Sequence, residues 1–369
     1  MHSHNNLRIL SHALCVATAL LFLATPATKA DDQPANDYYM YVAAESADEV
    51  YKVVFDGKQA RVDEVIDVGY QATEIEGPHG LTVGLDGKHW YLSMAHGQPF
   101  GILYKYETET NKLVGRTELG MFPATMQISP ASQLLYCANF NLHGRMLPSS
   151  ISIVDTEAMV EVARTRTGPM PHGSRVSADG MHHYSCAMMS GHLFELDALT
   201  FKVTRRLQLD EKQPEAHQSL VKPTWVHPHP KQRLAYVALN AAAQIAEIDL
   251  DKWRVTRRFA TDKGPYNLEL TPDGKKLVVS YKTAAKVGIW DVESGKELAR
   301  IPSMRKVTHG VAISPDGRFA FVTSEGIGAI KGALDVFDMQ TNKKVSSVEL
   351  GLQAGGITFW KSVPRKNPS

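Results

Sequence analysis

A short phrase returns seven times along this 369-residue chain at nearly constant spacing, and it constrains the fold more than any other feature. Its clearest copies are Pro78-His79-Gly80, Pro171-His172-Gly173 and Thr308-His309-Gly310. The seven equivalent positions lie 42 to 52 residues apart and are His79, Ala124, His172, Thr224, Tyr266, His309 and Gly355. A period of this length is typical of a repeated supersecondary unit that packs against its own copies.

Each repeat contains four short apolar segments. After the phrase comes a turn such as Asp273-Gly274, then an apolar run at 277–279 and another that ends on Asp at 287–291. Asp-Gly favours a tight turn because glycine accepts a positive φ. A last segment leads into the next copy of the phrase. Four strands in each repeat predict the antiparallel blades of a β-propeller.

The two ends of the chain complete one further blade. Six full repeats fit between His79 and Leu350, while residues 38–69 supply three strands and residues 354–360 supply one. We therefore predict an all-β, seven-bladed β-propeller that forms a single domain over residues 31–360. Pairing of the N-terminal strands (38–69) with the C-terminal strand (354–360) would close the ring and remove exposed sheet edges. Residues 361–369 are expected to form a loose tail.

The first thirty residues have the pattern of an export signal. Arg8 precedes an apolar stretch at 13–24, and the small residues Thr28 and Ala30 stand before Asp31. This pattern predicts a Sec-type signal peptide over residues 1–30 and a periplasmic or secreted protein. The stretch is too short to span a membrane, so we expect no membrane span in the mature protein.

The charge balance of the mature chain argues against nucleic acid as a partner. Removal of residues 1–30 leaves 38 basic against 39 acidic residues. A near-neutral protein has no field that would attract nucleic acid. We therefore expect no nucleic-acid partner, and a monomer.

The blade openings resemble a known family. Residues 264–280 run Gly-Pro-Tyr-Asn, then Pro-Asp-Gly, then an apolar strand, and this order is similar to the YVTN-type β-propeller family of secreted proteins. The resemblance covers nearly all of the mature chain. It implies the fold and leaves the function open, because the family includes binding, structural and enzymatic members.

Histidines and a methionine are expected to gather at one mouth of the channel. Three repeat positions are histidines, and loops between second and third strands lie on the same side. The candidate metal ligands are His79, His172, His309, His96, His143, His192 and Met188. Neutral imidazole binds copper and other transition metals, and thioether sulfur favours Cu(I), so we expect copper first. The alternative is that Pro-His-Gly is only turn chemistry.

Two distant resemblances support a metal at this mouth. Nitrous oxide reductase is similar in gathering a histidine-rich copper site there, and the propeller of cytochrome-type nitrite reductase supplies histidine ligands near its axis. The chain has no Cys-x-x-Cys-His, so we expect no covalent haem. It has no phosphate loop or dinucleotide fingerprint, so we expect no nucleotide.

Three functions remain open at this point. The first is a binding or redox-accessory protein that holds a transition metal and meets a periplasmic redox or other protein partner. The second is a lactonase or lyase that uses a mouth histidine with a glutamate, for which Glu74, Glu76, Glu215 and Glu325 are candidates. The third is a metal-free interaction scaffold. Cys137 and Cys186 are expected either to form a disulfide or to stay buried as free thiols.

Overall fold

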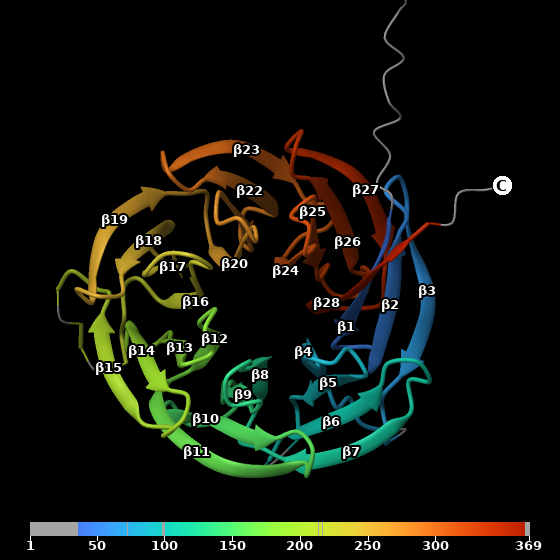
Figure 1. The fold of residues 1–369 in the computed structure, drawn as a ribbon, viewed down its shortest axis with the longest axis horizontal. Helices are drawn as coiled ribbons and strands as arrows, with labels where there is room; N and C mark the ends of the chain where they lie inside the picture. The colour runs from blue at the N-terminus through green and yellow to red at the C-terminus, as the bar shows by residue number, and fades with distance from the viewer. Residues whose placement is uncertain (1–35, 72, 98–99, 213, 216, 366–369) are drawn as a thin grey trace, which may run out of the picture. The chain divides into compact units, whose positions relative to one another are not determined.

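The described residues form a ring of seven four-stranded antiparallel sheets around a central channel (Figure 1). The structure is a computed structural model that describes residues 36–365 except 72, 98–99, 213 and 216. It confirms the predicted seven-bladed propeller. The predicted signal peptide, residues 1–30, lies outside the described residues. No helix among the described residues has the length and apolar character needed to cross a membrane.

Six blades are built from consecutive strands, which run from the channel outward. The first three are β4(Pro78–Val83), β5(His89–Met94), β6(Ile102–Glu107), β7(Leu113–Glu118); β8(Pro123–Ile128), β9(Leu135–Asn139), β10(Pro148–Asp155), β11(Val160–Pro169); and β12(Pro171–Val176), β13(His182–Ala187), β14(His192–Asp197), β15(Val203–Gln208). The next three are β16(Pro223–Pro228), β17(Leu234–Leu239), β18(Gln244–Asp249), β19(Arg254–Ala260); β20(Pro265–Leu270), β21(Lys276–Tyr281), β22(Lys286–Asp291), β23(Lys296–Pro302); and β24(Thr308–Ile313), β25(Phe319–Ser324), β26(Ala333–Asp338), β27(Lys343–Glu349).

The seventh blade joins the two ends of the chain. Its strands are β28(Ala354–Pro364), β1(Asn36–Ala44), β2(Glu49–Phe55) and β3(Ala60–Asp67), in that order from the channel. β28 and β1 pair antiparallel, with Ile357 opposite Val42 and Pro364 opposite Asn36. The predicted closure is therefore confirmed. β28 continues four residues beyond 360 because that part of the chain also pairs with β1.

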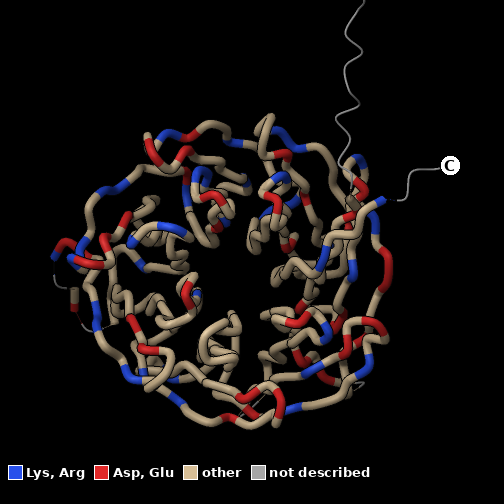
Figure 2. Tube along the Cα trace, viewed as in Figure 1, with Lys and Arg blue, Asp and Glu red and all other residues tan. Residues whose placement is uncertain are grey.

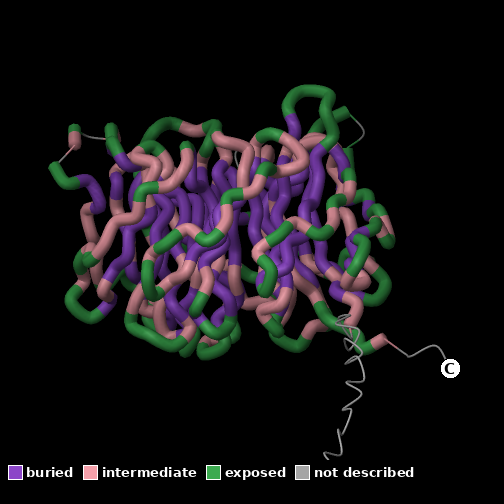
Figure 3. The backbone as a smooth tube through the Cα atoms, turned by 90° about the horizontal axis from the view of Figure 1, so that it is seen from above, coloured by how far each residue is buried: buried purple, intermediate pink, exposed green. Residues whose placement is uncertain are grey.

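The core lies between neighbouring blades. Second strands are almost wholly buried, whereas outer strands such as β27 alternate between exposed and half-buried residues. Figure 3 shows buried residues through the middle of the ring and exposed ones at the loops above and below. Acidic and basic residues are interspersed around the outer rim (Figure 2). Only the inner strands and the loops at the two faces remain free to form a functional site.

The two cysteines lie in different blade interfaces. Cys137, on β9, packs with Tyr91 and Leu103 of the preceding blade. Cys186, on β13, packs with Val226 and Val237 of the following blade. Both are buried free thiols. The sequence had allowed the two sulfurs to face one another between the second and third blades. Instead Cys137 faces the first blade and Cys186 faces the fourth.

Candidate functional site

The repeated His-Gly pair forms a β-bulge at the start of each inner strand that carries it. Pairing between the first and second strands shifts between Pro78 and Leu81 in one blade and between Pro171 and Ser174 in another. A bulge leaves the extra residue unpaired and turns its side chain away from the sheet. A side chain on the glycine would overlap the backbone of the next blade, as for Gly80 against Ala124. The pair therefore directs an imidazole into the channel while the blades stay in close contact.

Three bulges place three histidines together at the centre of the channel. One ring nitrogen from each of His79, His172 and His309 lies within 4.8 Å of the other two. The ring centroids are 5.8 Å apart for His79 with either partner and 6.2 Å apart for His172 with His309. Their exposed fractions are 7%, 0% and 4%. Such a buried group of three imidazoles can hold a metal ion.

The electrostatic setting keeps two of these imidazoles neutral. Burial lowers the pKa of His172 well below its ordinary value, and the nearby His79 and Lys282 act in the same direction. Burial also lowers the pKa of His309 well below its ordinary value, with further lowering from Lys282 and His79. Neutral imidazole is the form that binds metals, so both rings have a ligand lone pair near neutral pH.

Loop residues that directly follow the second strands surround the histidines on one side. Glu45 accepts a hydrogen bond from His79 Nδ1 at 2.6 Å and from His96 Nε2 at 2.9 Å. Burial alone would raise the pKa of Glu45, but the two histidines outweigh it and hold that pKa well below the ordinary range. Lys282 pairs with Glu325 at 3.1 Å. This side of the site is therefore lined by charged partners from blades five to seven.

In the other blades, aromatic side chains pack against the histidines on the same side of the site. Phe140 lies edge-on to His172 at 4.6 Å, and Phe122 lies edge-on to His79 at 5.2 Å. These two phenylalanines pack together in a buried cluster. The three histidines had been predicted to ring this mouth, but here they lie beneath it.

The other candidate ligands lie outside the three-histidine group. His96 pairs with Glu45, and its ring centroid is 5.6 Å from that of His143. Phe122 contacts both His143 and His79. Met188 packs against the phenylalanine cluster. His192 lies on β14, with its ring 5.8 Å from that of Phe194. The structure thus groups three of the seven candidates.

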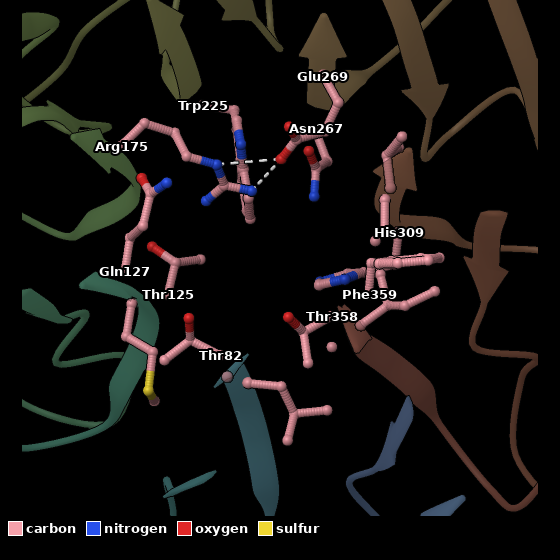
Figure 4. Close-up of a pocket in the computed structure, with 18 of the residues that line it drawn as sticks. Thr82, Thr125, Gln127, Arg175, Trp225, Asn267, Glu269, His309, Thr358 and Phe359 are labelled. Atoms are coloured by element: carbon pink, nitrogen blue, oxygen red, sulfur yellow. Dashed lines mark hydrogen bonds and ion pairs between the residues drawn. The ribbon is translucent and has the colours of Figure 1, made fainter. Parts of the chain in front are cut away.

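A cavity of about 230 Å³ extends from the histidines toward the opposite face, where the Asp-Gly turns lie. His79 and His309 form part of its wall. A second ring of side chains also lines the cavity. Each of these residues lies three positions after a repeat position, about 10 Å further along its strand. This ring consists of Thr82, Gln127, Arg175, His227, Glu269, Ala312 and Thr358. Figure 4 shows Arg175 and Gln127 on one wall and His309 with Thr358 on another.

A half-buried ionic group dominates this second ring. Arg175 donates from Nε to Glu269 Oε1 at 3.0 Å and also pairs through Nη2. His227 Nε2 lies 2.7 Å from the other oxygen of Glu269. Burial alone would raise the pKa of Glu269, but Arg175 and then His227 lower it to about 2. The guanidinium stacks over Trp225 at 4.9 Å. Arg175 Nη1 also donates to the Ser174 carbonyl oxygen at 2.9 Å, so one N–H on each terminal nitrogen remains to bind an anion.

Several of these residues escaped the sequence reasoning. Arg175, His227 and Glu269 each lie three residues after a repeat position. Glu45 and Lys282 each follow directly after a second strand. The offset could have revealed them, because residues at the same offset in different blades share one level of the channel.

Comparisons with known proteins agree with this architecture. Among solved structures the chain is similar to hydrazine synthase from Kuenenia stuttgartiensis, at 19% identity and a TM-score of 0.62, over 78% of this chain and 92% of that one. It is similar to a protein of unknown function from Desulfotomaculum acetoxidans DSM 771, at 14% identity and a TM-score of 0.69, over 87% and 98%. It is also similar to a protein from Bacteroides uniformis ATCC 8492 provisionally named a 6-phosphogluconolactonase, at 14% and 0.66, over 88% and 99%.

Likeness at these identities shows the fold alone. A search of curated protein sequences found no match. The family described as "Lactonase, 7-bladed beta-propeller" matches residues 38–331, which is most of the chain. This match places the protein among the seven-bladed propellers that the blade openings had indicated. The chain belongs to the seven-bladed β-propeller lactonase family.

Proposed function

We propose that the protein is a hydrolase that opens a small lactone in the channel cavity. One observation carries the proposal: a single cavity joins His79 and His309 of the three-histidine group to the Arg175–Glu269–His227 group. Family membership supports the same reaction class. The volume of about 230 Å³ is below the usual range for ligand pockets, so a substrate of about monosaccharide size is expected.

The two ends of the cavity would have different tasks. The free N–H groups of Arg175 would bind an anionic substituent, with Glu269 fixing the guanidinium plane. The ester carbonyl would then lie toward His79 and His309, about 10 Å along the strands. Opening the ring needs removal of a proton from water, and these two histidines supply groups for that step.

A lactone-hydrolysis screen with matched variants tests the proposal. We expect Arg175→Ala to raise KM for an anionic lactone by more than tenfold and to change turnover of a neutral lactone far less. We expect His79→Ala to lower kcat by 10²- to 10⁴-fold, the usual contribution of acid–base catalysis. His89→Ala, which changes a histidine on β5 outside the three-histidine group, is the control. Absence of turnover with all lactones, or full activity in His79→Ala, would refute the proposal.

The buried histidines favour a second candidate function, transition-metal binding in an accessory role with a periplasmic redox partner. Copper is the first candidate because neutral imidazoles bind it strongly. This role rests on the export signal proposed for residues 1–30. Metal analysis of protein purified from the periplasm tests it. One copper ion per chain without lactone turnover would support this role, and negligible metal would reject it.

A further inference from the structure

The three channel histidines leave ring nitrogens that nothing among the described residues satisfies. Nδ1 of His172 and Nδ1 of His309 are buried without a hydrogen-bond partner. His79 uses Nδ1 to contact Glu45, which leaves its Nε2 free. Burying an unpaired polar atom is costly, and one nitrogen from each ring lies within 4.8 Å of the others. Three buried rings this close together, two of them with an unsatisfied nitrogen, point to a ligand that binds all three.

A divalent transition-metal ion fits this geometry and charge. An ion equidistant from three atoms at the 4.8 Å limit would lie about 2.8 Å from each, so the rings need to close by less than about 1 Å to reach the usual zinc–nitrogen distance. The Glu45 carboxylate lies 2.6 Å from His79 and the Glu325 carboxylate lies 3.6 Å from His309, close enough to offset an ion's charge. The charges beside the three rings therefore suit a bound cation.

Outer hydrogen bonds also suit a metal site. Glu45 Oε2 lies 2.6 Å from His79 Nδ1, and the Tyr266 hydroxyl lies 3.0 Å from His172 Nε2. Metal-binding histidines normally donate their second N–H to a carboxylate or another oxygen, which fixes the tautomer and the ring orientation. A ring that donates Nε2–H to Tyr266 keeps a lone pair on Nδ1. Glu45 is thus a positioning residue that favours the His79 tautomer with its proton on Nδ1. Tyr266 is a positioning residue that favours the His172 tautomer with its proton on Nε2.

We infer that His79, His172 and His309 bind one divalent transition-metal ion whose open coordination side faces the cavity. His79 and His309 line the cavity, whereas Phe122 and Phe140 cover the rings on the other side. Three protein ligands with one open position are typical of catalytic rather than structural zinc sites. The cavity therefore gives an exogenous molecule a path to the ion from the side where Arg175 lies.

The consequence for chemistry rests on the proposed lactone hydrolysis. Water on the open side gives up a proton more readily, and its oxygen forms a bond to the ester carbonyl carbon. The bond between that carbon and the ring oxygen breaks, and the departing oxygen takes up the proton. The product is a hydroxy acid, with no change in oxidation state. Arg175 holds the far end of the same substrate, so the ion and the ionic group form one composite site.

Cobalt titration of chelator-treated protein tests the ion site without relying on activity. We expect the wild type to bind one Co²⁺ per chain with a visible absorption spectrum that changes when azide is added, because azide occupies the open side. His172→Ala should weaken binding at least tenfold. His183→Ala is the matched control, since His183 is equally buried and unpaired but stacks on Tyr136. Tyr266→Phe, which keeps the ring, should weaken binding by up to tenfold.

The outcomes separate the ion site from the proposed reaction. No Co²⁺ binding by the wild type, or equal binding by His172→Ala, overturns the inference. Lactone turnover that persists in metal-free protein rejects the ion's part in the reaction, while leaving the hydrolase and the ion site standing. Binding with an azide response but no lactone turnover supports the ion site and rejects the hydrolase. Turnover that disappears on chelation and returns with Zn²⁺ supports both.

Discussion

Four of the seven channel positions are followed by a glycine that the neighbouring blade requires, rather than its own backbone. A Cβ on Gly356 would overlap the carbonyl oxygen of His79, whereas one on Gly355 would meet only ordinary contacts, the nearest being His309 Nδ1 at 3.5 Å. Neither glycine has a positive φ. We expect Gly356→Ala to lower the free energy of unfolding by about 1–3 kcal/mol. Gly355→Ala, measured beside it by urea unfolding, should be nearly neutral. Equal losses would contradict this account.

The ionised state of Glu269 gives the protein a specific acid sensitivity. Its pKa falls from 4.5 to about 2 in the folded state, so as pH drops the unfolded chain takes up the proton first. The stability that this group contributes, on the order of 3 kcal/mol, is present above about pH 4.5 and lost toward pH 2. Glu269→Gln should therefore be less stable than the wild type at pH 7, with the gap shrinking at pH 3.

The control for this effect is Glu211→Gln, because the Glu211 side chain is 80% exposed. Urea unfolding of the three proteins at pH 7, 5 and 3 gives the comparison. A gap between the wild type and Glu269→Gln that stays constant over this range would mean that the carboxylate is not held ionised by Arg175.

At the scale of strands, the repeat predicted most of what the structure contains. Period and turn signals located the strands and the closing pair, because these depend on local chemistry and on the count of apolar segments. The bulge at His79 was not predicted, since alternation along a strand carries no mark of one extra residue. The open side of the site was also misplaced. It depends on the packing of Phe122 beside His79 and of Phe140 beside His172, which is a packing outcome between different blades.

Blade interfaces also decide the state of the two cysteines. Cys137 on β9 and Cys186 on β13 are fully buried in separate interfaces, and burial raises the pKa of both thiols. A thiol needs exposure and its thiolate form to react. In a chain that begins at Asp31, we expect no reaction with a thiol reagent in the folded state and two reactive thiols after urea unfolding. One rapid thiol in the folded protein, or a disulfide seen on non-reducing gels, would contradict this.

The ring as a whole depends on β28, which is the only strand of the described blades that comes from the other end of the chain. It supplies the inner edge of the seventh sheet and packs Phe359 and Trp360 against Tyr38 and Tyr41. A chain ending at residue 351 would leave the channel-side edge of β1 unpaired and an apolar surface exposed. We expect this truncated chain to aggregate or to lose its single cooperative unfolding transition.

A circular permutant separates the need for this strand from the need for its position in the sequence. Pro364 lies opposite Asn36, so a short linker can join residue 365 to residue 36 in a chain that starts at 352 and ends at 351. All seven sheets then consist of consecutive strands, and every interface is kept. We expect the permutant to be monomeric by gel filtration and to unfold within a few degrees of the wild type. If the truncated chain instead matched both proteins in thermal unfolding, closure by β28 would contribute little, and stability would reside in the six blades formed by consecutive strands.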